Sequence, residues 1–77
     1  MTLFDKIGVL KVLSHADGGC SYCVGNLVEY VMDEFPQDDW RAVRDQLEWF
    51  FLKDKGWGVS PADVIKEIDN YLEVLAE

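Results

Sequence analysis

The sequence contains few cysteine, histidine and basic residues, which are the residue types that form metal sites, redox sites and polyanion-binding surfaces. Its 77 residues include two cysteines, one histidine and seven basic residues, against 15 acidic residues. The formal net charge of −8 argues against direct binding of nucleic acid or of an anionic membrane surface. Two cysteines are also too few for a disulfide-rich secreted scaffold.

Long hydrophobic runs are missing as well. The longest run of bulky apolar residues, at positions 49–52, is far shorter than a membrane span. No basic segment of the kind that opens a signal peptide follows Met1. We therefore expect a soluble, cytoplasmic chain, and its length predicts a single domain over residues 1–77 with one modest core.

The spacing of the apolar residues predicts an all-α fold, a compact four-helix bundle-like domain. No segment alternates with period two for long enough to indicate a strand. Helices are expected at about residues 2–14, 21–35, 38–55 and 61–76. The first begins with a capping box, Thr2 with Asp5, and the last with Ser60 followed by Pro61 and Asp63.

Each predicted helix carries apolar residues that should face the core. The first is apolar on nearly all sides, so it should lie deep in the bundle. The inward stripes of the other three comprise Val24, Leu27, Val28, Val31 and Phe35; Trp40, Val43, Leu47, Phe50 and Phe51; and Val64, Ile65, Ile68, Tyr71, Leu72 and Leu75. A second stripe on the third helix, Ala42, Trp49 and Leu52, indicates that this helix is central or shared with a partner, for which a homodimer is one alternative.

A Cys-x-x-Cys motif, Cys20 to Cys23, lies at the start of the second predicted helix, five residues after His15. One interpretation is a zinc site formed by these three residues with Asp17 as a fourth ligand, although a second pair of ligands is missing. Another is a redox pair activated by the helix N-terminus, although no strand precedes it. The third is structural, with Cys23 as a small buried residue and His15 at a helix end. On the third interpretation the protein needs no metal or cofactor.

No other pattern points to catalysis. The glycine-containing segments at residues 18–19 and 56–58 match neither the phosphate-binding loop nor the dinucleotide fingerprint. With a single histidine, acid–base chemistry would depend on carboxylates alone. We predict that the chain is not an enzyme.

The acidic residues are concentrated in two segments. Residues 26–39 contain five acidic residues and no basic one, and residues 61–77 contain five acidic residues and one lysine. Acidic residues four apart repel each other on a helix, so this spacing is mildly unfavourable. The segments form either a solvated surface or a surface complementary to a basic partner. The residues concerned are Glu29, Asp33, Asp69, Glu73 and Glu77.

The three tryptophans are expected in different environments. Trp40 belongs to the predicted core, and Trp49 falls off the main stripe as a candidate exposed anchor. Trp57 lies between two glycines, either folded back on the core or projecting outward. These features predict a small acidic binding module or inhibitor that engages a basic surface on a partner protein. Phage inhibitors and immunity proteins act in this way on nucleic-acid-handling enzymes and toxins, and here Trp49 or Trp57 would anchor the contact while the acidic residues steer it.

The order of elements over residues 7–59 resembles a helix-turn-helix or winged-helix layout. A helix, a glycine-containing turn, a short helix and a longer helix are followed by the sequence Lys-Gly-Trp-Gly. The resemblance implies an acidic, dimeric regulator. The helix that would read DNA, residues 38–54, carries five acidic and three basic residues, so contact with protein is favoured over contact with DNA.

Overall fold

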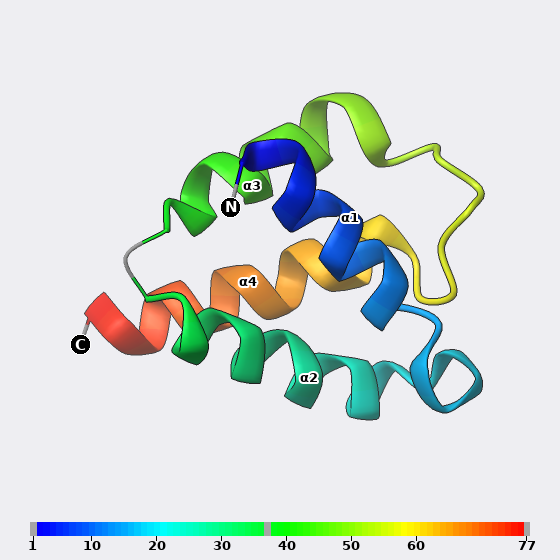
Figure 1. Cartoon of the computed structure of the whole chain (residues 1–77), viewed down its shortest axis with the longest axis horizontal. Helices are drawn as coiled ribbons and strands as arrows, with labels where there is room; N and C mark the ends of the chain where they lie inside the picture. The colour runs from blue at the N-terminus through cyan, green and yellow to red at the C-terminus, as the bar shows by residue number, and fades with distance from the viewer. Residues whose placement is uncertain (1, 37, 77) are drawn as a thin grey trace.

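A computed structural model describes residues 2–36 and 38–76 and confirms the all-α fold (Figure 1). No strand occurs in these residues. None of their helices is long and apolar enough to cross a membrane. The α-helices are α1 (Leu3–Leu13), α2 (Ser21–Glu34), α3 (Trp40–Gln46) and α4 (Pro61–Ala76). A 3₁₀ turn (Ala16–Gly19) leads into α2, and a π-helical turn (Leu47–Phe51) extends α3.

Local capping signals fix the starts of α1 and α4 as predicted. The Asp5 amide donates to Thr2 Oγ1 over 3.1 Å, and the Thr2 amide donates to Asp5 Oδ2 over 3.2 Å. The hydrogen bond that the Thr2 amide donates to the Asp5 carboxylate lowers the pKa of Asp5, and the Thr2 side chain lowers it further. The Asp63 amide donates to Ser60 Oγ over 3.4 Å, and Pro61 is the first residue of α4. Both signals act within one turn of chain, which is why the sequence suffices to locate them.

The third helix is shorter than the predicted residues 38–55. Its N-cap is Asp39, whose Oδ1 accepts a 3.0 Å hydrogen bond from the Ala42 amide. The helix widens into the π-turn at Leu47 and ends at Phe51, whose carbonyl accepts from the Asp54 amide over 3.0 Å. The following residues leave the helix because they fold back onto the end of α1.

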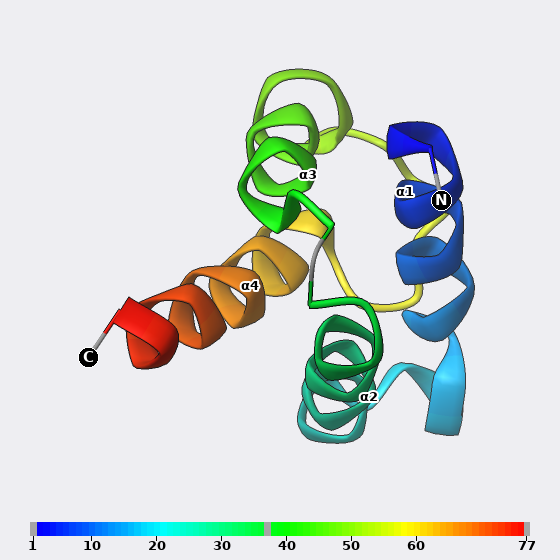
Figure 2. The same ribbon diagram turned by 60° about the vertical axis from the view of Figure 1, so that its left-hand side comes forward.

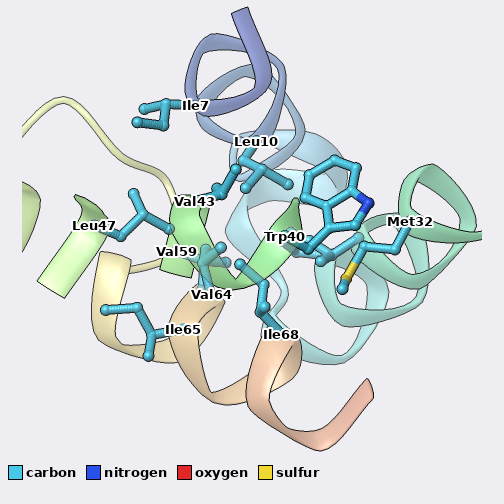
Figure 3. Close-up of a cluster of buried hydrophobic side chains, with 12 residues drawn as sticks. Ile7, Leu10, Met32, Trp40, Val43, Leu47, Val59, Val64, Ile65 and Ile68 are labelled. Carbon is cyan, nitrogen blue, oxygen red and sulfur yellow. The ribbon is translucent and has the colours of Figure 1, made fainter. Parts of the chain in front are cut away.

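The four helices surround a common core. Figure 2 shows them around a central space in the order α1, α2, α4, α3, each packed on its two neighbours. α2 and α4 run in the same direction, with α2 along one edge of the molecule and α4 packed beside it (Figure 1). The core is filled mainly by aliphatic side chains (Figure 3): Ile7, Leu10, Val24, Val28, Met32, Trp40, Val43, Leu47, Val59, Val64, Ile65 and Ile68.

Several predicted core positions are wrong. Phe35, Phe50 and Leu75 are exposed, and Met32 is fully buried instead. On α2, contact with both α1 and α4 shifts the buried stripe toward Met32. On the third helix, the wider i→i+5 turn moves Phe50 away from the face of Leu47 while Phe51 still packs against the core.

The prediction that the first helix lies deep is also wrong. Ile7 and Leu10 face the core, but Phe4 and Val12 are exposed. A chain of this size has too few elements to cover α1 on more than one side. Lys6, in contrast, is buried. Its Nζ lies 3.7 Å from Asp38 Oδ1 and 5.9 Å from the centroid of the Trp40 ring, and so joins α1 to the start of α3.

Candidate protein-binding surface

The three tryptophans lie in three different environments. Trp40 is buried, and its indole N–H donates a 2.9 Å hydrogen bond to the Phe35 carbonyl. Trp57 is half-buried and packs against the core, which confirms the folded-back alternative. Trp49 is 78% exposed, as the sequence predicted. It is therefore the tryptophan that is open to contact with another molecule.

Trp49 belongs to a contiguous apolar surface that we call the Trp49 patch, formed by Trp49, Phe50 and Leu52. Phe50 is 72% exposed and Leu52 is 47% exposed. The π-turn creates the patch because it directs two consecutive aromatic side chains to solvent while Leu47 and Phe51 hold the turn to the core. Two open hollows adjoin Trp49, and both are lined by Glu48 and Leu52.

A cluster of charged residues, which we call the Arg44 cluster, lies beside this patch. Arg44 Nε donates to Asp69 Oδ1 over 2.9 Å, and Nη1 lies 3.1 Å from Asp45 Oδ1 and bonds Glu48 as well. These bonds, first that to Asp69 and then that to Asp45, raise the pKa of Arg44. One guanidinium is set against three carboxylates, so the cluster keeps a net charge of about −2 at neutral pH.

The remaining predicted acidic residues that the structure describes lie in two different places: some are on α2, and the others are on the side of α4 that faces α3. Glu29 and Asp33 are exposed on α2, where Asp33 accepts a hydrogen bond from the Tyr71 hydroxyl of α4. That bond, then burial and the charges of Asp33 and Glu29, raise the pKa of Tyr71. Asp69 instead faces α3 through Arg44.

The acidic residues therefore do not form one cluster. Glu73 is exposed and lies one turn after Asp69 on α4, so the two share the α3-facing side of this helix. Glu77 lies outside the described residues. Of the residues predicted to contact a partner, Asp69 is the one that the structure places in the charged cluster beside the Trp49 patch. The sequence analysis did not identify Asp45 and Glu48. The i, i+4 spacing of Arg44 and Glu48 was the available signal for Glu48, whereas helical spacing gives none for the adjacent Asp45.

The segment after the Trp49 patch is fixed to the end of α1 by polar contacts. Asp54 Oδ2 accepts from Lys11 Nζ over 3.1 Å and from the Trp57 indole N–H over 2.8 Å. The bond from Trp57, then that from Lys11, lower the pKa of Asp54. Trp57 thus serves to hold this loop, and the loop in turn fixes the C-terminal side of the patch.

His15 and Ser14 extend these contacts. His15 Nε2 lies 2.8 Å from the Gly56 carbonyl, which requires the tautomer or ionic form with a proton on Nε2. The buried Ser14 hydroxyl donates to the Lys11 carbonyl over 2.6 Å and accepts from the Gly58 amide over 3.0 Å. The side chain of the single histidine is thus bound to the loop.

Of the metal ligands considered above, the structure describes the side chains of His15, Cys20 and Cys23, while that of Asp17 lies outside the described part. Among the described residues, no group of three or more His, Cys, Asp or Glu is placed to hold a metal ion. Cys20 is exposed at the N-cap of α2, and Cys23 is half-buried one turn later. His15 makes the contact to the Gly56 carbonyl described above.

Comparison with protein-family models, with curated proteins and with solved structures finds no match to this chain.

Proposed function

We propose that this chain is a protein-binding module that docks on a basic surface of its partner through the Trp49 patch. The observation that carries the proposal is the exposure of Trp49 and Phe50 next to a cluster with three carboxylates. Isolated exposed apolar residues are normal, but adjacent exposed aromatic side chains beside a charged rim are typical of protein interfaces. This proposal follows the function that the sequence predicts and assigns it to one surface.

The two parts of the surface have different tasks. Trp49 supplies the apolar area, since a tryptophan that becomes fully covered in an interface is among the commonest binding hot spots. The carboxylates of Asp45, Glu48 and Asp69 remain partly exposed around Arg44, at the rim of the contact. Rim charges mainly increase the rate of association and select partners of opposite charge.

The charge of the whole chain supports a basic partner. A protein with a net charge of −8 is repelled by other acidic surfaces and attracted by basic ones over about one Debye length, roughly 8–10 Å at moderate salt. Basic protein surfaces of this kind occur on nucleic-acid-handling enzymes and on nuclease-type toxins. Binding there would act as inhibition if it covered the nucleic-acid site.

Site-specific photo-crosslinking tests the proposal. A photoreactive phenylalanine analogue is placed at Phe50 and, as the control, at Tyr30, which is exposed on α2. Crosslinking in a lysate should capture a basic protein from position 50 and not from position 30. An acidic partner, or equal capture from both positions, would contradict the assignment.

The captured partner then permits a quantitative test. Trp49→Ala should weaken binding at least tenfold, and Tyr30→Ala should change it less than twofold. The association rate should fall as salt rises, because the rim charges are screened. Wild-type affinity in the Trp49→Ala variant would show that the patch is not the docking surface.

A further inference from the structure

The outer side of α1 forms a second apolar surface, far along the chain from the Trp49 patch. We call it the α1 face, and its members are Phe4, Gly8, Val9, Val12 and Leu13. Phe4 is 71% exposed and Val12 is 73% exposed, and these residues together with Asp5 line an open hollow. Nothing lies within 4 Å of the position that a Cβ would occupy on Gly8. The face is therefore uncovered along most of the helix.

Phe4, Gly8 and Val12 follow one another at intervals of four residues, so they lie along one side of the helix. Gly8 is midway between the two larger side chains and leaves the backbone accessible at the centre. This arrangement is self-complementary. If a second α1 packs antiparallel with the two Gly8 residues at the crossing point, Phe4 of each copy lies at the level of Val12 of the other.

The charges on α1 are compensated within the chain. Lys6 is paired with Asp38 and Lys11 with Asp54, and Asp5 lies in the first turn of α1, where the positive end of the helix dipole favours a carboxylate. Residues 1–25 carry two acidic and two basic residues, in contrast to the acidic segments at 26–39 and 61–77. The α1 face thus gives neither a strongly basic nor a strongly acidic partner an electrostatic advantage.

We infer that the α1 face binds a second copy of this chain, antiparallel and centred on Gly8. Two copies of so acidic a protein repel each other less when the acidic C-terminal part of α4 lies away from the contact. Figure 2 shows α1 at one edge of the molecule and the C-terminal end of α4 at the opposite edge. Contact through α1 therefore keeps the two copies of α4 far from each other.

The size of the face sets the strength of the dimer. Two helices of 11 residues, about 16 Å long each, form a contact at the low end of specific interfaces. We expect a dissociation constant on the order of 10⁻⁴ M, so that the dimer forms at high local concentration. Higher salt should strengthen it, because salt screens the repulsion between the two acidic chains. Higher salt should instead weaken the binding of a basic partner through the Trp49 patch, because that attraction is screened.

Analytical ultracentrifugation of the full chain up to about 1 mM tests the inference, since a dimer of the expected affinity is then well populated. The wild-type mass should approach twice that of the chain. Val12→Glu should weaken dimerisation at least tenfold, and Val74→Glu should leave it unchanged, since Val74 is equally exposed on α4. Trp49→Ala should also dimerise like the wild type, which separates this inference from the proposed function. A monomeric wild-type chain, or a dimer unaffected by Val12→Glu, would overturn it.

A charge-swap pair tests the orientation. Phe4→Lys alone and Val12→Glu alone should each weaken the dimer, whereas the double variant should recover it at least tenfold relative to either single variant. In the antiparallel arrangement Lys at position 4 faces Glu at position 12 of the other copy at both ends. A parallel pair would place like charges together, and a double variant no better than the single ones would overturn the antiparallel arrangement. Both side chains are exposed, and a circular dichroism melt verifies that each variant is folded.

Discussion

Gly58 lies so close to Ser14 that a side chain at position 58 would collide with the backbone of α1's C-terminal end. A Cβ on Gly58 would fall 2.2 Å from the Ser14 carbonyl oxygen and 2.8 Å from His15 Cα. The same glycine donates its amide to Ser14 Oγ over 3.0 Å. This approach joins residues 44 positions apart and fixes the loop between the Trp49 patch and α4.

Gly58→Ala should therefore destabilise the fold. Overpacking of this kind costs about 1–3 kcal/mol, and here the opposing atoms belong to the backbone and cannot move aside cheaply. Urea unfolding followed by circular dichroism measures the change. Gly25→Ala is the matched control, because its Cβ would meet the end of the flexible Glu67 side chain. Equal stability of the two variants would show that the loop is not closely packed against α1.

Trp49 and Trp40 should respond very differently to truncation. Trp49→Ala should change the free energy of unfolding by no more than about 0.5 kcal/mol, because the side chain is exposed. Trp40→Ala should cost about 3–5 kcal/mol, because it empties part of the core and removes a bond to the Phe35 carbonyl. Denaturation of both variants checks this. A large loss of stability in Trp49→Ala would mean that the π-turn buries this side chain.

Acid should loosen the loop that Asp54 holds. Hydrogen bonds from Trp57 and Lys11 lower the pKa of Asp54, so the carboxylate stabilises the fold above the ordinary pKa of an aspartate. That contribution is lost as the pH falls through the lowered pKa, below about pH 4. Limited proteolysis of the loop with an acid-tolerant protease should therefore accelerate in this range. Asp54→Asn should raise cleavage at neutral pH, and Asp45→Asn, a change in the Arg44 cluster, should not.

The Tyr71 hydroxyl should report on Asp33 at high pH. Its pKa is raised chiefly by the hydrogen bond to Asp33, so the neutral tyrosine stabilises the α2–α4 contact below the ordinary tyrosine pKa. This contribution disappears as the pH rises through the raised value. Asp33→Asn should lower the pKa of Tyr71, measured from ring carbon chemical shifts in NMR. Glu73→Gln is the control, since residues two apart face different sides of a helix. An unchanged Tyr71 titration in Asp33→Asn would exclude the contact.

The sequence by itself determined the features that act over one or two turns of chain. The Thr2–Asp5 capping box and the Ser60–Pro61 start are made by neighbouring residues, so no distant contact was needed to locate α1 and α4. The absence of period-two alternation likewise identified an all-α chain. The off-stripe position of Trp49 was sufficient to predict its exposure.

The predicted buried sides of α2, α3 and α4 are confirmed at most positions, but only the tertiary structure decided which side of α1 is buried and which distant residues meet. Because α1 is apolar on nearly all sides, its pattern of apolar residues does not indicate which side is buried. In the structure α1 packs against α2 and α3, and Phe4 and Val12 remain exposed. The π-turn changed the helical period that had placed Phe50 in the core. The pairing of Asp69 with Arg44, and of Asp33 with Tyr71, depends on how the helices pack around α4. Local sequence preferences determine where a helix forms, but its buried side depends on how all the helices pack together to cover apolar surface.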